Sequence, residues 1–587
     1  MRARTKIICT LGPSCNSYEK IVELIQCGMN VARLNLSHGT QEEHKTRIDL
    51  LKRARKALGT PLAIMLDTKG PEIRVGKIAD EGITLTAGQE LFLVAEPIVG
   101  DEKRISITPG HVLAKLAEGV RVLFDDGYIL SRVVQKKSDG VVVAIENDGI
   151  LRSYKGVNIP DSDADLPVMT EKDIDDLRFG CNEGVDLIAA SFIRSPDHVL
   201  EIKRFLTKHG GASILVLAKI ENWQGVQNFD DILRVADGIM VARGDLGVEL
   251  SLTQVPKLQK MMIRQCRIAG KPVVIATQML ESMINNPRPT RAEVSDVAGA
   301  IYDSATAIML SGETAVGQYP IEATRMMYHI ALEAEQDFPY REFFFHSAQS
   351  DYKDITHSIA LAAVRIAYST DAKAIFAFTN TGKTARYVSQ FRPEMPIVAL
   401  SSSEKAYHQM ALNWGVYPVP PTPAKNAQEA FQLTKEYALQ REFVQWGDLI
   451  VATAGIPFGE PGTTNMTFVE SIGDVLVRGN AHSGKNTHGV VAIVHTAEEK
   501  KPEAVRGKIL LLLRCDASYA ALIEVASGLI LQNSPIDLES EQFAMQKAEE
   551  LRLPLITRAD GATEKIHEGQ KILLDPTKGV VYKETSA

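Results

Sequence analysis

The sequence has few of the features that mark secreted or zinc-stabilised proteins. Its 587 residues include only six cysteines, at positions 9, 15, 27, 181, 266 and 515, and none belongs to a CxxC pair. A disulfide framework is therefore not expected, and a reduced, cytoplasmic protein fits the composition best. The histidines are scattered and form no HExxH pattern, so a structural zinc site is not expected either.

Long hydrophobic runs and an excess of positive charge are also missing. No apolar run has the length of a membrane-spanning helix, and the N-terminal MRARTKIICTLG lacks the layout of a signal peptide. The net charge of −8 argues against a general nucleic-acid binder. We therefore expect neither a membrane nor nucleic acid as a partner. The chain is too long for one hydrophobic core, which predicts three or four domains.

One stretch, residues 214–247, carries the clearest chemical signal. Two short apolar runs (214–218 and 238–242) flank a helix-length segment, which predicts a βαβ unit with parallel strands. Lys219 and Glu221 follow the first run, and Asp245 follows the second, so these side chains should emerge at one sheet edge. Two carboxylates beside a lysine suit Mg²⁺ and a phosphoryl group. A surface salt bridge is the alternative interpretation of this unit taken alone.

Similar runs predict eight parallel strands in the first part of the chain. They are Lys6–Thr10, Val31–Asn35, Ala63–Asp67, Leu187–Ser191, Ile214–Lys219, Ile239–Arg243, Val273–Thr277 and Ala307–Ser311. Eight β/α units indicate a closed barrel with its chemistry at the carboxyl ends of the strands. The polar residues at those ends would face one mouth: Arg33, Asn35, Ser37, Asp67, Lys69, Lys219, Glu221, Asp245, Thr277, Ser311 and Glu313.

The remaining segments predict three further domains. Short Val/Ile/Leu runs between Gly and Asp turns over residues 71–167 indicate a small inserted β domain that can close as a lid. Thr170 and Asp173 then mark the start of a helix where the barrel resumes. We expect an α/β protein: a (β/α)8 TIM barrel (1–70 and 168–338), an inserted small β-barrel domain (71–167), a linker (338–352), an open α/β domain (353–473) and an extra C-terminal α/β domain (474–587).

Two loops have some of the character of phosphate-binding loops. Thr379, Asn380, Thr381, Gly382, Lys383 and Thr384 join a strand to a helix, where backbone N–H groups and hydroxyls can cradle a phosphate. This is not a Walker A loop, since Ala377 stands where that pattern needs glycine. An ordinary polar turn is the alternative. Residues 479–486 miss the pattern at their last position and precede a strand, so we reject them as a nucleotide loop.

Long motifs in register carry a resemblance to a known family. They are TKIICTLGPS (5–14), MNVARLNLSHG (29–39), MLDTKGPEIRVG (65–76), LAKIEN (217–222), IMVARGDLGVE (239–249), ATQMLESM (276–283), MLSGETAVGQYP (309–320) and TAGIPFGEPGTTN (453–465). The chain resembles the pyruvate kinase family over residues 1–473.

The resemblance implies phosphoryl transfer from phosphoenolpyruvate to ADP, giving pyruvate and ATP. Glu221 and Asp245 would hold Mg²⁺ or Mn²⁺, Lys219 would stabilise the phosphoryl group, and Arg33 would bind the phosphate. The backbone of Ala242, Arg243, Gly244 and Asp245 would bind the substrate carboxylate. Thr277 would lie beside the enolate, and Ser311 and Glu313 would relay a proton. For Ser311 and Glu313, simple hydrogen bonding at a strand end is the alternative.

The resemblance also implies further binding sites. Asn35, Ser37, Asp67 and Thr68 would form a K⁺ site, with Glu72 as the mark of potassium dependence. His38, Asn35, Arg74 and Lys69 would bind the nucleotide, although Lys69 could instead pair with Asp67 or Glu72. The loop of residues 379–384, with Arg386, would bind a phosphorylated effector such as AMP or ribose 5-phosphate. Members of the family are usually homotetramers.

The last segment is similar to the swivelling phosphohistidine domain of phosphoenolpyruvate synthases. No histidine stands in the corresponding stretch, Leu538–Phe543, so we expect a structural or assembly role. Two other functions remain open. Another metal-dependent barrel enzyme, such as an aldolase or phosphonomutase, would not need the inserted domain, a K⁺ site or Lys219. A metabolite sensor without activity would be indicated by loss of Lys219 or the metal carboxylates, and both are present.

Overall fold

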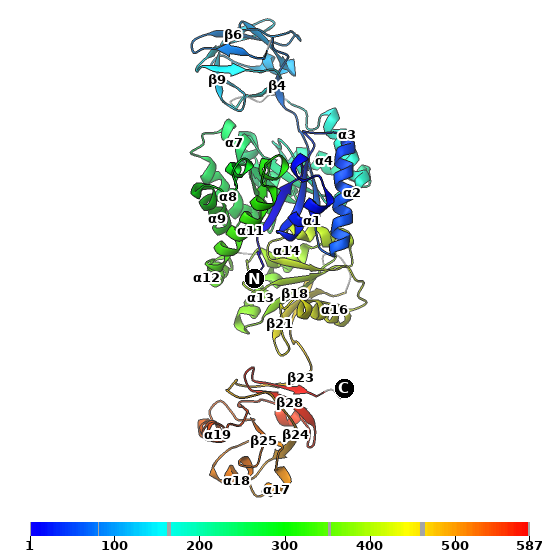
Figure 1. Ribbon diagram of the computed structural model, residues 1–587, viewed down its shortest axis with the longest axis vertical. Coiled ribbons are helices and arrows are strands. Elements are labelled where there is room, and N and C mark those ends of the chain that lie inside the picture. The colour runs from blue at the N-terminus through cyan, green and yellow to red at the C-terminus, as the bar shows by residue number, and fades with distance from the viewer. Residues whose placement is uncertain (1, 80, 161–165, 350–353, 458–463, 585–587) are drawn as a thin grey trace. The chain divides into compact units, whose positions relative to one another are not determined.

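The computed structural model describes residues 2–79, 81–160, 166–349, 354–457 and 464–584 (Figure 1). The chain forms two compact units. One comprises Met1–Val364, Phe376–Thr434 and Thr453–Met466, and the other comprises Arg365–Ile375, Lys435–Ala452 and Thr467–Ala587. The sites discussed below all lie within the first unit.

Eight parallel strands close into a barrel in the order β1-β17-β16-β15-β14-β13-β3-β2. This confirms the predicted barrel, and the strand bounds differ from the predicted ones by no more than two residues. The strands are β1 (Lys6–Thr10), β2 (Met29–Asn35), β3 (Ala63–Asp67), β13 (Leu187–Ala190), β14 (Leu215–Ile220), β15 (Gly238–Ala242), β16 (Val273–Ala276) and β17 (Ala307–Leu310). Because these strands are buried on both faces, their sequences are nearly continuous apolar runs.

Helices surround the barrel strands (Figure 1). They are α1 (Tyr18–Gln26), α2 (Gln41–Leu58), α3 (Glu171–Glu183), α4 (Pro196–Lys208), α5 (Trp223–Gln227), α6 (Phe229–Val235), α7 (Arg243–Glu249), α8 (Val255–Ile268), α9 (Arg291–Tyr302), α10 (Gly312–Ala315), α11 (Pro320–Gln336), with 3-10 turns η1 (Pro13–Cys15) and η3 (Glu281–Ile284). Helix α3 begins as predicted, because the Thr170 hydroxyl accepts from Asp173 N–H and the Asp173 carboxylate accepts from Thr170 N–H.

The inserted domain is a second closed barrel, with the strand order β10-β6-β7-β4-β12-β8-β9 and a separate pair β11-β5. Its elements are β4 (Ile73–Val75), β5 (Ile83–Leu85), β6 (Glu90–Val94), β7 (Arg104–Thr108), η2 (Gly110–Lys115), β8 (Arg121–Phe124), β9 (Ile129–Lys137), β10 (Gly140–Ile145), β11 (Gly149–Leu151) and β12 (Gly156–Asn158). Its strand pairs are antiparallel except β6 with β7, which is parallel. The predicted small β-barrel is confirmed.

A five-stranded sheet follows, in the order β20-β19-β18-β21-β22. Its elements are α13 (Ile355–Ser369), β18 (Ala374–Phe378), α14 (Lys383–Ser389), β19 (Ile397–Leu400), α15 (Glu404–Gln409), η4 (Met410–Leu412), β20 (Val416–Val419), α16 (Ala427–Gln440), β21 (Leu449–Gly455) and β22 (Thr464–Ser471). The predicted linker differs, because residues Tyr340–Ser347 form helix α12. Residues 350–352 of that linker, and 458–463 of the motif at 453–465, lie outside the described residues.

The last segment forms a seven-stranded sheet in the order β23-β29-β28-β24-β25-β26-β27. Its elements are β23 (Val475–Arg478), β24 (Thr487–Val494), α17 (Pro502–Val505), β25 (Ile509–Leu512), η5 (Ala517–Tyr519), α18 (Ala520–Ile523), β26 (Gly528–Leu531), α19 (Leu538–Leu551), β27 (Leu555–Ile556), α20 (Ala562–Lys565), β28 (Lys571–Asp575) and β29 (Val580–Lys583). The strand expected after residues 479–486 is β24, which supports the rejection of that loop as a nucleotide site.

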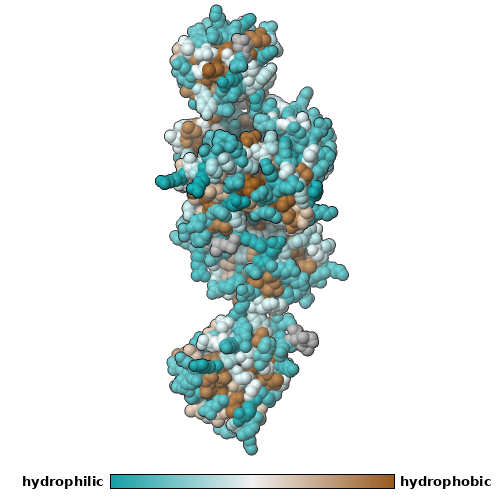
Figure 2. All heavy atoms as spheres, in the orientation of Figure 1, coloured by the Kyte–Doolittle hydropathy of each residue, from teal (hydrophilic) through white to brown (hydrophobic). Residues whose placement is uncertain are grey.

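The surface and the helix lengths agree with the composition. The face shown in Figure 2 is largely hydrophilic, with small and separate hydrophobic patches. Among the described residues, none of the helices combines the length and the apolarity needed to cross a bilayer.

Candidate active site

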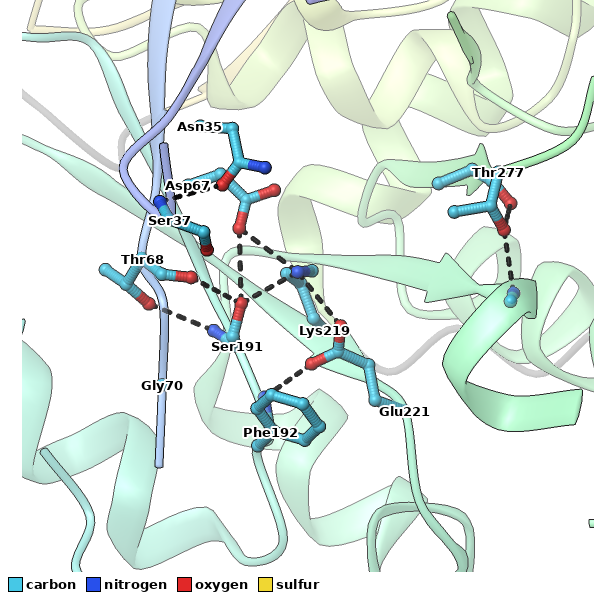
Figure 3. Close-up of polar contacts among 12 residues, drawn as sticks. Asn35, Ser37, Asp67, Thr68, Gly70, Ser191, Phe192, Lys219, Glu221 and Thr277 are labelled. Carbon is cyan, nitrogen blue, oxygen red and sulfur yellow. Dashed lines mark hydrogen bonds and ion pairs between the residues drawn. The ribbon is translucent and has the colours of Figure 1, made fainter. Parts of the chain in front are cut away.

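Lys219 is the centre of a buried polar network at the mouth of the barrel (Figure 3). Its Nζ lies 2.9 Å from Glu221 Oε1 and 3.1 Å from Asp67 Oδ1, and it donates to Ser191 Oγ at 2.7 Å. Lys219 is only 8% exposed, and Glu221 and Asp67 are each 1% exposed. The ammonium is therefore held in one position by two carboxylates and a hydroxyl.

The barrel order explains why these residues meet. Strands β14, β13, β3 and β2 are consecutive neighbours in the closed sheet. Their carboxyl ends bring together Lys219, Ser191 and Asp67, and Arg33 completes the row from β2. Arg33 Nε donates to Asp67 Oδ2 at 2.6 Å and its NH1 donates to Thr10 Oγ1 at 2.9 Å. Two cations thus share Asp67.

The charges of this network shift its pKa values in opposite directions. Burial alone raises the pKa of Asp67, but the positive charges of Arg33 and Lys219 outweigh burial and hold it below its usual range. Burial raises the pKa of Glu221 to about 7, against the opposing effect of Lys219 and with a further contribution from Asp245. Although burial lowers the pKa of Lys219, the two carboxylates raise it overall, so the lysine stays charged.

Glu221 and Asp245 suit a divalent ion. Glu221 Oε2 accepts from the backbone N–H of Phe192 at 2.6 Å, which fixes the carboxylate. Asp245 lies in the first turn of α7 and is close enough to raise the pKa of Glu221. No group of three or more His, Cys, Asp or Glu side chains in the described part of the chain is arranged for a metal. Two carboxylates are nevertheless what Mg²⁺ usually takes from a protein, with water and phosphate oxygens as the other ligands.

Asn35, Ser37, Asp67 and Thr68 gather on one side of Lys219 (Figure 3). Asn35 Oδ1 accepts from Ser37 N–H at 3.1 Å. The carbonyl oxygen of Thr68 accepts from Ser191 Oγ at 2.6 Å, and the Thr68 hydroxyl accepts from Ser191 N–H at 3.1 Å. Amide, hydroxyl, carbonyl and carboxylate oxygens together form a donor set that suits K⁺.

Thr277 and the start of α7 form the opposite part of the mouth. Gly244 N–H donates to Thr277 Oγ1 at 2.8 Å, and Thr277 has a positive φ of 69°. A threonine at positive φ is uncommon and marks a constrained position. The Arg243 guanidinium is fully engaged: it donates to Asp296 at 2.7 and 2.9 Å and to the Thr277 carbonyl at 2.7 Å. These bonds link the start of α7 to the backbone after β16 and to Asp296 of α9.

Glu313 is completely buried and satisfied by backbone groups. Its Oε1 accepts from Leu280 N–H at 3.0 Å and its Oε2 accepts from Ser311 N–H at 2.7 Å. This geometry favours the simpler interpretation, in which Glu313 and the Ser311 backbone fix the loop after β17. Neither observation brings the Ser311 hydroxyl or Glu313 into the Lys219 network.

A cavity of about 490 Å³ lies beside the network. It is lined by Thr10, Pro13, Arg33, Asn35, His38, His44 and Arg47, among others. Its size suits a ligand as large as a nucleotide. The other two predicted nucleotide residues line no part of this cavity. Lys69 Nζ lies 3.7 Å from Glu72 Oε2, and Arg74 NH2 lies 2.6 Å from the same oxygen. The predicted pairing of Lys69 with Glu72 is present.

A second cavity, of about 290 Å³, includes Arg74, Asp126, Lys155, Asp245 and Glu249 in its lining. Burial and the charges of Asp125 and Asp245 raise the pKa of Asp126. Lys155 Nζ lies 2.8 Å from Asp125. Residues of the inserted barrel and of the main barrel thus contribute to one cavity that includes Asp245, one of the two carboxylates predicted to bind Mg²⁺.

Gly382 and Thr384 of the predicted effector loop are buried, whereas Thr381 and Lys383 are exposed. Gly382 has a φ of 79° and ends the loop before α14. A Cβ at this position would come within 2.8 Å of Met410 Cγ. The carbonyl of Asn380 accepts from Ser401 Oγ at 3.0 Å, and the hydroxyl groups of Thr384 and Thr464 are 2.6 Å apart. Arg386 follows in α14 and lines a small cavity together with Lys271 and Arg392. None of residues 379–384 lines that cavity.

Sequence reasoning missed three groups in this site. Ser191 and Thr10 follow or end barrel strands, exactly as the predicted mouth residues do, and that position is the signal that could have identified them. The third is the backbone N–H of Phe192, which has a positive φ of 55°. The amino-acid type at position 192 gives no sign of this contact, because a backbone N–H is present at nearly every residue and only the path of the backbone directs it to Glu221.

The fold and the mouth define the chain as a barrel enzyme of the phosphotransferase class. Sequence models described as "Pyruvate kinase, barrel domain" and "Pyruvate kinase, alpha/beta domain" match residues 2–324 and 357–470. The chain is 42% identical over 585 residues to the pyruvate kinase of Geobacillus stearothermophilus, with 99% of each chain covered. It is 41% identical over 581 residues to that of Sporosarcina psychrophila, with 99% of this chain and 98% of the relative covered. The chain belongs to the pyruvate kinase family.

The coverage also bears on the last segment. Because the alignments span 99% of this chain, these relatives extend through residues 474–587 as well. In this segment Glu541 is a buried charged residue of α19. Its carboxylate accepts from Arg558 Nε and NH2 at 3.0 and 2.8 Å and from Thr557 Oγ1 at 3.0 Å. These contacts are internal to the segment and are consistent with a structural role.

Proposed function

We propose that the chain transfers the phosphoryl group of phosphoenolpyruvate to ADP, with Mg²⁺ or Mn²⁺ and K⁺ as cofactors. The bond between phosphorus and the enol oxygen breaks, a bond to a β-phosphate oxygen of ADP forms, and the enolate takes a proton at carbon to give pyruvate. The observation that carries this proposal is the buried Lys219, fixed by Asp67, Ser191 and Glu221 at the barrel mouth.

The residues of the mouth supply positioning and charge, which dominate phosphoryl transfer. Lys219 places a fixed positive charge where negative charge develops on the transferring group. Arg33 binds the phosphate from β2. Thr277 and the backbone of residues 242–245 orient the substrate carboxylate. Glu221 and Asp245 hold the divalent ion, which supplies additional positive charge to the phosphoryl oxygens when bound.

The oxygen cluster of Asn35, Ser37, Asp67 and Thr68 is proposed as the K⁺ site. It adjoins Lys219 through Asp67 and Ser191, so an ion there would add to the positive potential around the phosphate. The 490 Å³ cavity with His38 and Asn35 is proposed for ADP, and Arg74 and Lys69 approach the phosphates from the hinge of the inserted barrel.

Regulation and assembly follow the family. The loop of residues 379–384 is proposed to bind a phosphorylated effector such as AMP or ribose 5-phosphate. Arg386 has the least structural support among the proposed effector residues, because it lines another cavity. We propose a homotetramer and a cytoplasmic location, and keep the four domain ranges given above as proposals. Residues 474–587 are proposed to serve structure or assembly.

A coupled assay of pyruvate formation from phosphoenolpyruvate and ADP tests this function. We expect turnover that requires a divalent ion and is strongly increased by K⁺ over Na⁺ at equal ionic strength. AMP or ribose 5-phosphate should lower the half-saturating phosphoenolpyruvate concentration. If no ion and neither effector supports turnover of the folded chain, the sensor hypothesis replaces the enzyme.

A further inference from the structure

A small cavity in the first unit is surrounded by cations. It lies where the turn after α8 meets α14, and its volume is about 20 Å³. Four basic residues line it: Arg267, Lys271, Arg386 and Arg392. The described residues that line it include no Asp or Glu. Like charges that converge on a cavity repel one another, so the arrangement is unfavourable unless something negative lies between them.

Arg392 is the most deeply buried of these cations, with 3% of the residue exposed. Its NH1 donates to the Ser389 carbonyl at 3.0 Å and its NH2 donates to the Ser304 carbonyl at 2.7 Å. The face of Trp414 lies 4.7 Å from the guanidinium carbon. All these partners are neutral, and in the described part of the chain Arg392 forms no ion pair. Burial and the charge of Arg267 lower the pKa of Arg392 to about 9, and the more distant charge of Glu335, which forms no ion pair with it, offsets this only in part.

Gln390 adds unpaired polar atoms to the same cavity. It is 4% exposed, and neither its Nε2 nor its Oε1 has a hydrogen-bond partner among the described residues. The same holds for the Nε atoms of Arg386 and Arg392. Buried polar groups are almost always paired in native proteins, and an unpaired group points to a water or an ion that completes it. Three side chains with this property line one cavity.

The other two cations are already engaged. Lys271 Nζ donates to the carbonyls of Leu233, Arg234 and Ala236 at 2.6, 2.9 and 2.7 Å. Arg267 NH1 donates to Ser347 Oγ at 2.7 Å. These two residues therefore contribute positive potential, and the groups left to make contact are the guanidinium groups of Arg386 and Arg392 and the amide of Gln390.

We propose that this cavity binds a chloride ion between Arg386, Gln390 and Arg392. The volume decides the class of ligand, because about 20 Å³ is room for one or two solvent-sized particles and not for a sugar phosphate. The charge argues against water alone, since a neutral molecule would leave four converging cations with no negative charge inside the cavity. The site is separate from residues 379–384 and does not depend on the proposed activity. A bound chloride ties α14 to the base of the barrel.

Anomalous scattering locates the ion directly. Crystals of the full-length protein grown in sodium bromide should show a bromide peak in this cavity, in contact with Arg386, Gln390 and Arg392. Peaks only elsewhere on the surface would mean adventitious ions and would overturn the proposal, as would a map with no peak in the cavity.

A carboxylate introduced by substitution at the cavity can replace the negative charge of the proposed chloride. Gln390→Glu places a carboxylate at the cavity without a large change in volume. In wild type, replacing gluconate by chloride at equal ionic strength should raise the melting temperature, by about 2 °C for each tenfold increase in chloride above the dissociation constant. Gln390→Glu should melt at a higher temperature than wild type in gluconate and show neither the chloride response nor the bromide peak.

The matched control is Gln227→Glu, which makes the same change at an exposed position and should keep the chloride response of wild type. If wild type melts at the same temperature in chloride and gluconate, or if Gln390→Glu retains both the full chloride response and the bromide peak, the cavity does not hold chloride. A response to phosphate without one to chloride would also overturn the assignment.

Discussion

Replacement of Ser191 by alanine tests the network around Lys219 most sharply. Ser191 Oγ accepts from Lys219 Nζ at 2.7 Å and donates to the Thr68 carbonyl at 2.6 Å, in a fully buried setting. Ser191→Ala removes these two hydrogen bonds and a third, weaker one to Asp67 Oδ1 at 3.2 Å. It leaves Lys219 with Asp67 at 3.1 Å and Glu221 at 2.9 Å. The lysine stays charged and anchored, but one of the three groups that fix its position is lost.

The magnitude follows from the type of bond. A buried hydrogen bond to a charged group contributes about 1.5–3 kcal/mol. Because two carboxylates still hold the ammonium, we expect the lower part of this range, about 1.5–2 kcal/mol. At 1.36 kcal/mol for each factor of ten, kcat/KM for phosphoenolpyruvate should fall about 10- to 30-fold. Most of the loss should be in kcat, since the lysine acts on the transition state.

Steady-state kinetics at saturating Mg²⁺ and K⁺ measure this effect, with Ser131→Ala as the control. Ser131 is also a buried serine, and it donates to the Val122 carbonyl at 2.6 Å inside the inserted barrel. Its replacement should lower stability and leave kcat/KM within about twofold of wild type. If Ser191→Ala also stays within twofold while folding normally, the hydroxyl does not position Lys219, and the reasoning is refuted.

Three further predictions follow from the same geometry. Glu72→Lys should relax the potassium requirement, so that its activity ratio between K⁺ and Na⁺ approaches one; an unchanged ratio would contradict the K⁺ site. Since burial raises the pKa of Glu221 to about 7, protons should compete with Mg²⁺, and titrations should show Mg²⁺ affinity falling about tenfold per pH unit below pH 7 and constant above it. Gly382→Ala should weaken activation by ribose 5-phosphate, because its Cβ would approach Met410 Cγ to 2.8 Å at a φ of 79°. Gly59→Ala, at a φ of 57° with open space around it, is the control, and equal effects of the two variants would contradict this prediction.

The barrel was predictable because its strands are short apolar runs that end in charge. That pattern is local, and it places Lys219, Asp67 and Arg33 at one edge without any knowledge of their contacts. The neighbouring order β14-β13-β3-β2, which brings them within hydrogen-bond distance, is a property of the closed sheet. The position of Ser191 at the end of a predicted strand could have identified it as a mouth residue, but its contacts with Lys219 and Thr68 emerge only from the packing of β13 between β14 and β3.

The missed elements have physical causes too. Helix α12 was missed in an aromatic stretch of sequence, and its Phe344 is fully buried. Arg386 was grouped with the preceding loop by its proximity in sequence. In α14 Arg386 lines the cavity that Lys271 and Arg392 also line, which its proximity in sequence to the loop could not indicate.

The central claim is that Lys219 acts on the transferring phosphoryl group, and one comparison tests it most directly. ³¹P NMR of phosphoenolpyruvate and ADP should show ATP growing as phosphoenolpyruvate disappears with wild type. Lys203→Met, which breaks the 2.8 Å ion pair with Asp237 away from the mouth, should retain that conversion. Lys219→Met should fold, bind Mg²⁺ and form ATP at least about 10³-fold more slowly. Equal rates for Lys219→Met and Lys203→Met would contradict the account.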